Sequence, residues 1–153
     1  MSDDAQRAPE PDRDHGPQRQ PEPDDQEHES AYELLQRGSA LLKQRHFAQA
    51  ATVLERADRE EPRKGSILEA LGRAYYNSGQ HERSRATFEV LLDIDPSAHY
   101  AHFALGQSLK QLAQPDAART HLRLAVALSP TSKVYAGALA RLGPRPAADG
   151  RED

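Results

Sequence analysis

The chain has 153 residues, a formal net charge of −4 and no cysteine. This length allows one ordinary domain, and the lack of cysteine excludes disulfides, thiolate metal sites and a cysteine nucleophile. No run of about 18 apolar residues occurs, which excludes a membrane-spanning helix, and no apolar signal stretch follows the first residues. We therefore expect a cytoplasmic protein. Arginine outnumbers lysine 16 to 4, a bias that is common in high-GC bacteria.

Residues 1–29 are predicted to form a disordered, acidic, proline-rich tail. They contain five prolines, and their apolar residues are Met1, Ala5 and Ala8. Residues 1–30 carry ten acidic side chains and three arginines, a net charge of −7. Such a segment cannot bury enough apolar surface to offset the entropy lost on ordering. Residues 143–153 have a similar composition and are predicted to be a second disordered tail.

The region from 30 to 142 repeats itself every 34 residues. Three glycines share this spacing: Gly38, Gly72 and Gly106. Three prolines share it as well: Pro62, Pro96 and Pro130. Two independent markers with one period indicate three copies of a single structural unit, at about 31–64, 65–98 and 99–132.

Helices are predicted at 31–44, 47–60, 66–78, 81–94, 99–112, 115–128 and 132–142. Ser30 with Glu33, and Ser66 with Glu69, have the spacing of a capping box at a helix start. Pro115 suits the first turn of a helix, where its missing N–H is tolerated. The repeated glycines lie inside helices despite their low helix propensity, so we expect a second helix to cross closely at each of them.

The residues between the markers resemble the tetratricopeptide repeat, in which W-x2-L-G-x2-Y is followed by A-x3-F and then by proline. The second unit matches best, with Leu71-Gly72, Tyr75, Ser84, Phe88 and Pro96. Arg37 and His102 depart from the pattern because a large apolar residue is usual there, and Leu91 replaces a small one. The resemblance covers residues 31 to about 142. It implies an all-α fold, a right-handed superhelical solenoid of three helix-turn-helix repeats with a C-terminal capping helix at 132–142.

In such a solenoid the first helix of each pair lines the concave surface. We expect the following side chains to face this groove: Tyr32, Leu35, Gln36, Ser39, Lys43, Glu69, Ala70, Arg73, Tyr76, Asn77, Tyr100, Phe103, Ala104, Gln107, Lys110 and Arg141. Aromatic side chains beside arginine are typical of surfaces that bind peptides. For Tyr100 and Phe103 the alternative is packing between neighbouring first helices.

The resemblance implies an adaptor or scaffold that binds a peptide or helix of a partner protein in the groove. The alternatives are a self-assembling subunit of a larger complex and a secretion chaperone of the same family. A subset of the family binds the C-terminal carboxylates of chaperones through a clamp of lysine, asparagine and arginine. The corresponding positions here are Leu35, Ser39, Ala70, Tyr100 and Ala104, so the clamp is absent. We expect a monomer or a weak homo-oligomer.

No enzyme activity, cofactor or metal site is predicted. The sequence contains no phosphate loop, nucleophile elbow or HExxH motif. His99 and His102 are three residues apart, but no third ligand is evident, and His102 is expected to replace a core residue. Residues 31–142 carry fifteen basic and eleven acidic side chains, a diffuse charge of +4 that does not indicate nucleic-acid binding. Two roles remain open for the acidic tail: occupying the basic groove, or only increasing solubility.

Overall fold

A computed structural model of the chain describes residues 28–146, and most of the two predicted tails lies outside these residues. The helices are α2 (Ala31–Lys43), α3 (Phe47–Glu60), α4 (Gly65–Asn77), α5 (His81–Ile94), α6 (His99–Gln111), α7 (Pro115–Leu128) and α8 (Lys133–Leu142). All regular elements of residues 28–146 are helices, which confirms the predicted all-α class. None of these helices is both long enough and apolar enough to cross a membrane.

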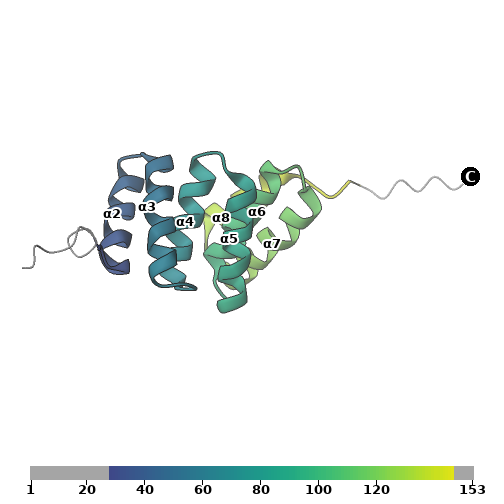
Figure 1. Ribbon diagram of the computed structural model, residues 1–153. Coiled ribbons are helices and arrows are strands. Elements are labelled where there is room, and N and C mark those ends of the chain that lie inside the picture. Colours follow the sequence, from purple (N-terminus) through teal and green to yellow (C-terminus); the bar gives the residue numbers. More distant parts are fainter. Residues whose placement is uncertain (1–27, 147–153) are drawn as a thin grey trace, which may run out of the picture.

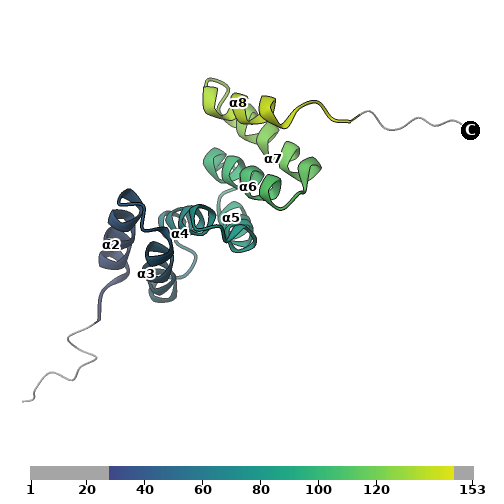
Figure 2. The ribbon, with the colours of Figure 1, turned by 90° about the horizontal axis from the view of Figure 1, so that it is seen from above.

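The helices form three antiparallel pairs, α2 with α3, α4 with α5 and α6 with α7, which stack side by side (Figure 1). Neighbouring pairs pack through α3 on α4 and α5 on α6, and α8 packs on α7. Seen from above, the array is curved, with α2, α4, α6 and α8 along its inside and α3, α5 and α7 along its outside (Figure 2). The first helix of each pair therefore lines the concave side, as predicted.

The predicted helix boundaries agree with the structure to within one residue. The capping box at the start of α2 is confirmed, because Glu33 N donates to Ser30 Oγ at 3.2 Å and Ser30 N donates to Glu33 Oε2 at 3.0 Å. Pro115 is the first residue of α7. The capping box predicted for Ser66 and Glu69 is wrong. The helix begins at Gly65, so Ser66 is already helical and its hydroxyl is not placed to cap the first turn.

The two helices of each pair cross closely at the repeated glycines. A Cβ atom at Gly72 would lie 2.6 Å from the ring of Phe88, and one at Gly38 would lie 2.5 Å from Leu54. At Gly106 the distance to Leu122 would be 2.8 Å. The three large side chains are fully buried, so they have no room to withdraw. The predicted close crossing is confirmed in all three repeats.

Each of the three departures from the repeat pattern has a local explanation. Arg37 is exposed and forms an ion pair with Glu29, its Nη1 lying 2.6 Å from Oε1. Leu91 is buried and fits beside Gly65, where a Cβ would lie 3.6 Å from Leu91 Cδ1. His102 is buried, as predicted for a residue that replaces a core side chain.

His102 forms a stacked pair with His121 of α7, with ring centroids 5.4 Å apart. His102 Nε2 lies 2.8 Å from the carbonyl oxygen of Pro96, so this nitrogen carries a proton and donates. His102 Nδ1 then accepts a hydrogen bond from His121 Nδ1 at 3.1 Å. Burial and then the neighbouring His102 lower the pKa of His121, against a smaller opposite effect of Glu89.

Acidification should destabilise the protein through this pair. The unfolded chain takes up a proton at His121 near pH 6.5, whereas the folded chain does so only at lower pH, so stability is lost as the pH falls below about 6.5. Urea unfolding at pH 7.5 and pH 5.5 measures this loss. The loss should be smaller in a His121→Gln variant and unchanged in His46→Gln, which alters an exposed histidine. An equal loss in His121→Gln and wild type would contradict the assignment.

Replacing the central glycine of the second repeat tests the close crossing. Gly72→Ala should lower the free energy of unfolding by about 1–2 kcal/mol, because overpacking against Phe88 exceeds the gain in helix propensity of about 1 kcal/mol. Gly137→Ala in α8 is the matched control, since its Cβ would approach only the flexible end of Arg141, at 3.2 Å. That variant should be as stable as wild type or more so. Chemical denaturation distinguishes the two, and an unchanged stability of Gly72→Ala would refute the explanation.

Candidate binding groove

Two adjoining pockets hollow the concave side. The first, between α4 and α6, has a volume of about 240 Å³, and we call it the aromatic pocket. It is lined by Arg73, Tyr76, Asn77, Phe88, Tyr100, Phe103, Ala104 and Gln107. The second, between α2 and α4, has a volume of about 370 Å³, and we call it the polar pocket. It is lined by Leu35, Gln36, Ser39, Leu42, Lys43, Ser66, Glu69, Ala70 and Arg73.

Most of the side chains predicted to face the groove line one of these pockets. Tyr32, Lys110 and Arg141 do not; all three are exposed. Sequence reasoning missed Phe88, which comes from α5 and forms the floor of the aromatic pocket although its side chain is fully buried. The sequence did contain a signal for Phe88. It is the large residue of A-x3-F in the second repeat, and the side chain at that position fills the space between helices.

The aromatic side chains form a connected series. Tyr100 packs edge-on against Phe88, with ring centroids 6.1 Å apart, and lies 6.1 Å from Phe103. Phe103 is stacked on Tyr135 of α8 at 4.9 Å. Phe103 thus packs between two neighbouring first helices, α6 and α8, and also lines the pocket. Tyr100 packs on the second helix of the preceding pair, α5, and lines the same pocket. Burial raises the pKa of Tyr100 and keeps its hydroxyl protonated, although Arg73 acts in the opposite direction.

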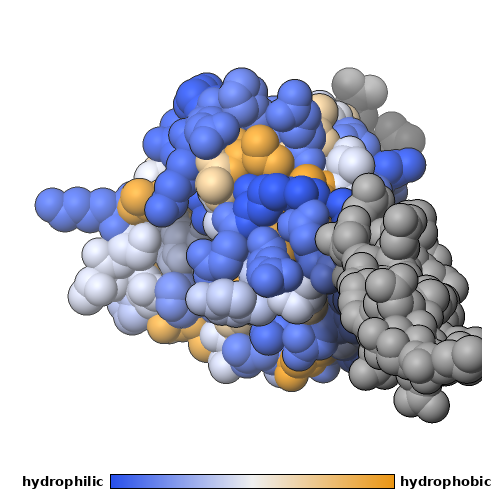
Figure 3. All heavy atoms as spheres, turned by 60° about the vertical axis from the view of Figure 1, so that its left-hand side comes forward, coloured by the Kyte–Doolittle hydropathy of each residue, from blue (hydrophilic) through white to orange (hydrophobic). Residues whose placement is uncertain are grey.

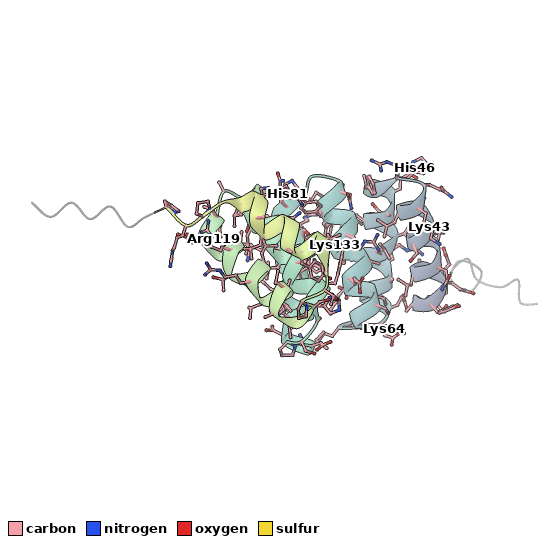
Figure 4. All side chains as sticks on the ribbon, turned by 180° about the vertical axis from the view of Figure 1, so that it is seen from behind. Lys43, His46, Lys64, His81, Arg119 and Lys133 are labelled. Carbon is pink, nitrogen blue, oxygen red and sulfur yellow. The ribbon has the colours of Figure 1, made fainter. Side chains whose placement is uncertain are left out.

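Arg73 is the charged residue shared by the two pockets. Among residues 28–146 it forms no ion pair, and neither does Lys43 at the α2 end of the groove. Asn77 Nδ2 donates to the carbonyl oxygen of Arg73 at 2.8 Å, which leaves the Asn77 Oδ1 as an acceptor. Seen from behind, toward the concave side, Lys43 lies near one end of the array and Lys133 lies closer to its middle (Figure 4).

A scan against protein families matches the tetratricopeptide repeat to residues 35–99 and, overlapping with these, to residues 70–133. The two matches span most of the three repeats and more than half of the chain. The chain belongs to the tetratricopeptide repeat (TPR) family.

Several solved TPR structures share this fold. The first TPR domain of Spaghetti (RPAP3), bound to an HSP90 peptide, has a TM-score of 0.71 and 15% identity, covering 74% of this chain and 90% of that one. The TPR domain of Sgt2 from Aspergillus fumigatus has a TM-score of 0.69 and 21% identity, covering 73% of this chain and 76% of that one. MamA from Desulfovibrio magneticus has a TM-score of 0.71 and 20% identity, covering 74% of this chain and 64% of that one. A search of curated protein sequences finds no match.

The five positions that correspond to the TPR carboxylate clamp do line the two pockets. Leu35, Ser39 and Ala70 lie in the polar pocket, and Tyr100 and Ala104 lie in the aromatic pocket. None of them carries the lysine, asparagine or arginine of the clamp. The basic side chains of this TPR groove therefore stand at other positions.

The last residues of the acidic tail contact the outside of the first TPR. Glu29 pairs with Arg37 of α2, and its Oε1 also lies 3.9 Å from Arg56 Nη1 of α3. His28 Nε2 lies 3.3 Å from Glu60 Oε2 of α3. Residues 28 and 29, assigned to the tail from sequence, are therefore held away from both pockets. The rest of the tail lies outside the described residues, so both roles considered for it stay open. On the end formed by α2 and α3, apolar areas are small and separated by hydrophilic ones (Figure 3).

His99 and His102 have different neighbours. His99 Nδ1 lies 2.7 Å from the hydroxyl of Tyr135, whereas His102 contacts His121 and Pro96. The two imidazoles are therefore used in separate hydrogen bonds. No cluster of three potential metal ligands occurs in the part of the chain that the structure describes.

Arg119 holds the capping helix at the end of the TPR array, and sequence reasoning missed it. It lies on α7 beside the C-terminal end of α8 and is only 5% exposed (Figure 4). Its Nη2 donates to the carbonyl oxygen of Gly143 at 3.1 Å, and its Nη1 donates to Asp116 Oδ1 at 3.2 Å. In sequence, an arginine in an amphipathic helix indicates a surface charge. Its burial depends on the turn at Gly143, which brings the chain back over α7.

Removing this guanidinium should loosen α8 selectively. Arg119→Met should speed amide hydrogen exchange in residues 133–142 by about tenfold or more, because the Gly143 carbonyl loses its charged donor. Arg123→Met, at an exposed position of the same helix, is the control and should leave this exchange unchanged. Exchange measured by mass spectrometry, with α4 as the internal reference, tests the assignment. Equal exchange of α8 in both variants would show that Arg119 does not hold it.

Proposed function

We propose that this TPR domain is a protein-interaction module, an adaptor that binds an extended segment of a partner protein along its concave groove. The observation that carries the proposal is the continuity of the two pockets, which meet at Arg73 and together run from α2 across α4 to α6. A continuous groove with aromatic walls and an unpaired cation is suited to a linear peptide.

The shape of the groove suits a peptide, because two open pockets adjoin along the array instead of forming one enclosed site. The aromatic pocket, at about 240 Å³, is smaller than the roughly 300–1,000 Å³ of ordinary small-molecule sites, and the polar pocket, at about 370 Å³, is at the lower end of that range. It has room for a single large side chain. The solved TPR domain of Spaghetti (RPAP3) with an HSP90 peptide is a precedent for a peptide on this fold. We propose a binding role without catalysis.

The polar side chains of the groove favour an extended segment over a helix. Gln36, Asn77 and Gln107 line the pockets with amide groups. An extended peptide presents unpaired backbone N–H and C=O groups that need such partners, whereas a helix has already paired most of its own. The absent carboxylate clamp removes the main reason to propose a chaperone C-terminus as the ligand.

Variants of the groove test the proposal. Binders selected from a random-peptide library on the wild-type domain should have dissociation constants near 1 μM, as expected of a short peptide. Arg73→Glu and Tyr76→Ala should each weaken them by about tenfold or more, as fluorescence anisotropy measures. Tyr32→Ala and Arg123→Glu are matched controls on exposed side chains outside the pockets and should bind as wild type does. Equal weakening by groove and control variants would refute the proposal.

A further inference from the structure

We infer that the groove selects an internal acidic residue that lies next to a bulky apolar residue of the bound segment. This inference rests on the proposed function and names the chemistry of the partner. It assigns the acidic residue to Arg73 and the apolar residue to the aromatic pocket.

The charge of the groove points to a carboxylate at Arg73. Its guanidinium is exposed and has no acidic partner among the described residues. None of the residues that line the aromatic pocket is acidic, and Glu69 is the single carboxylate lining the polar pocket. Tyr100, which also lines the aromatic pocket, adds a protonated hydroxyl as a second donor. A guanidinium binds a carboxylate through two parallel hydrogen bonds, which gives geometric selectivity.

The position of Arg73 indicates an internal acidic residue instead of a chain terminus. Arg73 lies where the pockets meet, so a bound carboxylate stands in the middle of the groove. A C-terminal carboxylate at this point would leave one pocket empty, whereas an internal Asp or Glu lets the peptide continue into both. Lys43, at the far side of the polar pocket, offers a second cation for an acidic residue further along the segment.

The aromatic pocket is suited to a large, preferably aromatic, side chain. Phe88 forms its floor, and Tyr100 stands edge-on to that ring. Phe103 forms part of the wall and is held from behind by the stacked ring of Tyr135. These walls are rigid because each ring packs on another. Ring–ring contacts add to the gain from burying apolar area, so an aromatic residue is favoured over an aliphatic one.

The same requirement separates a true ligand from the acidic tail of this chain. Residues 1–27 carry nine acidic side chains, but Met1 is their single large apolar residue. The tail thus offers the charge without an aromatic anchor. A groove with the selectivity inferred above would therefore not prefer the tail.

The random-peptide selection on the wild-type domain provides the first test. Enriched peptides should contain an Asp or Glu within one or two positions of Phe, Tyr, Trp or Leu. Enrichment of peptides without this pair would overturn the inference and leave the proposed function standing. A complete lack of enrichment would overturn both, so the two failures are distinguishable.

Synthetic derivatives of one enriched peptide provide the second test. Replacing its acidic residue by the amide should cost about tenfold or more in affinity for wild type and little for Arg73→Gln, as a double-mutant cycle would show. Replacing its apolar residue by alanine should cost a similar factor in both proteins. Amidation of the peptide's C-terminus should change nothing. A tenfold loss of affinity on C-terminal amidation would overturn the assignment. So would an equal loss of affinity in both proteins when the acidic residue is replaced by its amide.

Discussion

The close crossing of two helices over a glycine is the constraint on which the rest of this molecule depends. At Gly72 the absent side chain lets the ring of Phe88 lie directly on the backbone of α4. Because α5 sits so close, that ring reaches between α4 and α6, where it forms the floor of the aromatic pocket. One packing contact therefore closes the core of the repeat and shapes the candidate groove. A larger residue at position 72 would disturb both.

Buried hydrogen bonds and a ring contact join neighbouring helices from the second repeat to the capping helix. Ser84 Oγ donates to the buried carbonyl of Gly72 at 3.0 Å, and Ser108 of the next repeat lies 3.0 Å from Ser84. Buried hydroxyls of this kind set the register between neighbouring helices, since a shifted register would leave them unpaired. At the far end, Tyr135 supports Phe103. The capping helix α8 thus covers the last repeat and also stabilises one wall of the aromatic pocket.

The fold was predictable because its period is visible at the positions where the packing tolerates the fewest residue types. Glycines at the crossings and prolines at the helix ends follow the same interval, and helix boundaries follow from them. The site was predictable only where the period also determines which way a side chain points. Tyr32 and Arg141 stand at the two ends of the array, beyond both pockets. Ser66 has the same local spacing as Ser30, but the earlier start of α4 decides its role.

Features that depend on contacts distant in sequence were not predictable. The burial of Arg119 requires the chain to turn back at Gly143, and the pairing of His102 with His121 requires two helices to meet. Backbone conformation was not predictable from single residues either. Gly79 and Ala113 adopt a positive φ at equivalent turns of successive repeats. Glycine tolerates this conformation, whereas alanine there costs about 1 kcal/mol or more, so the repeat geometry prevails over local preference.

The period also explains how one scaffold can carry a specific groove. Ser39, Arg73 and Gln107 occupy the same position in the three repeats, 34 residues apart, and all three line the groove. The fold does not constrain this position, because its side chain points away from the crossing at the neighbouring glycine. A small hydroxyl, a cation and an amide therefore stand side by side on an unchanged backbone. The charge is confined to the middle one, and the chemistry that we propose for the bound segment rests on that single variation along the repeat.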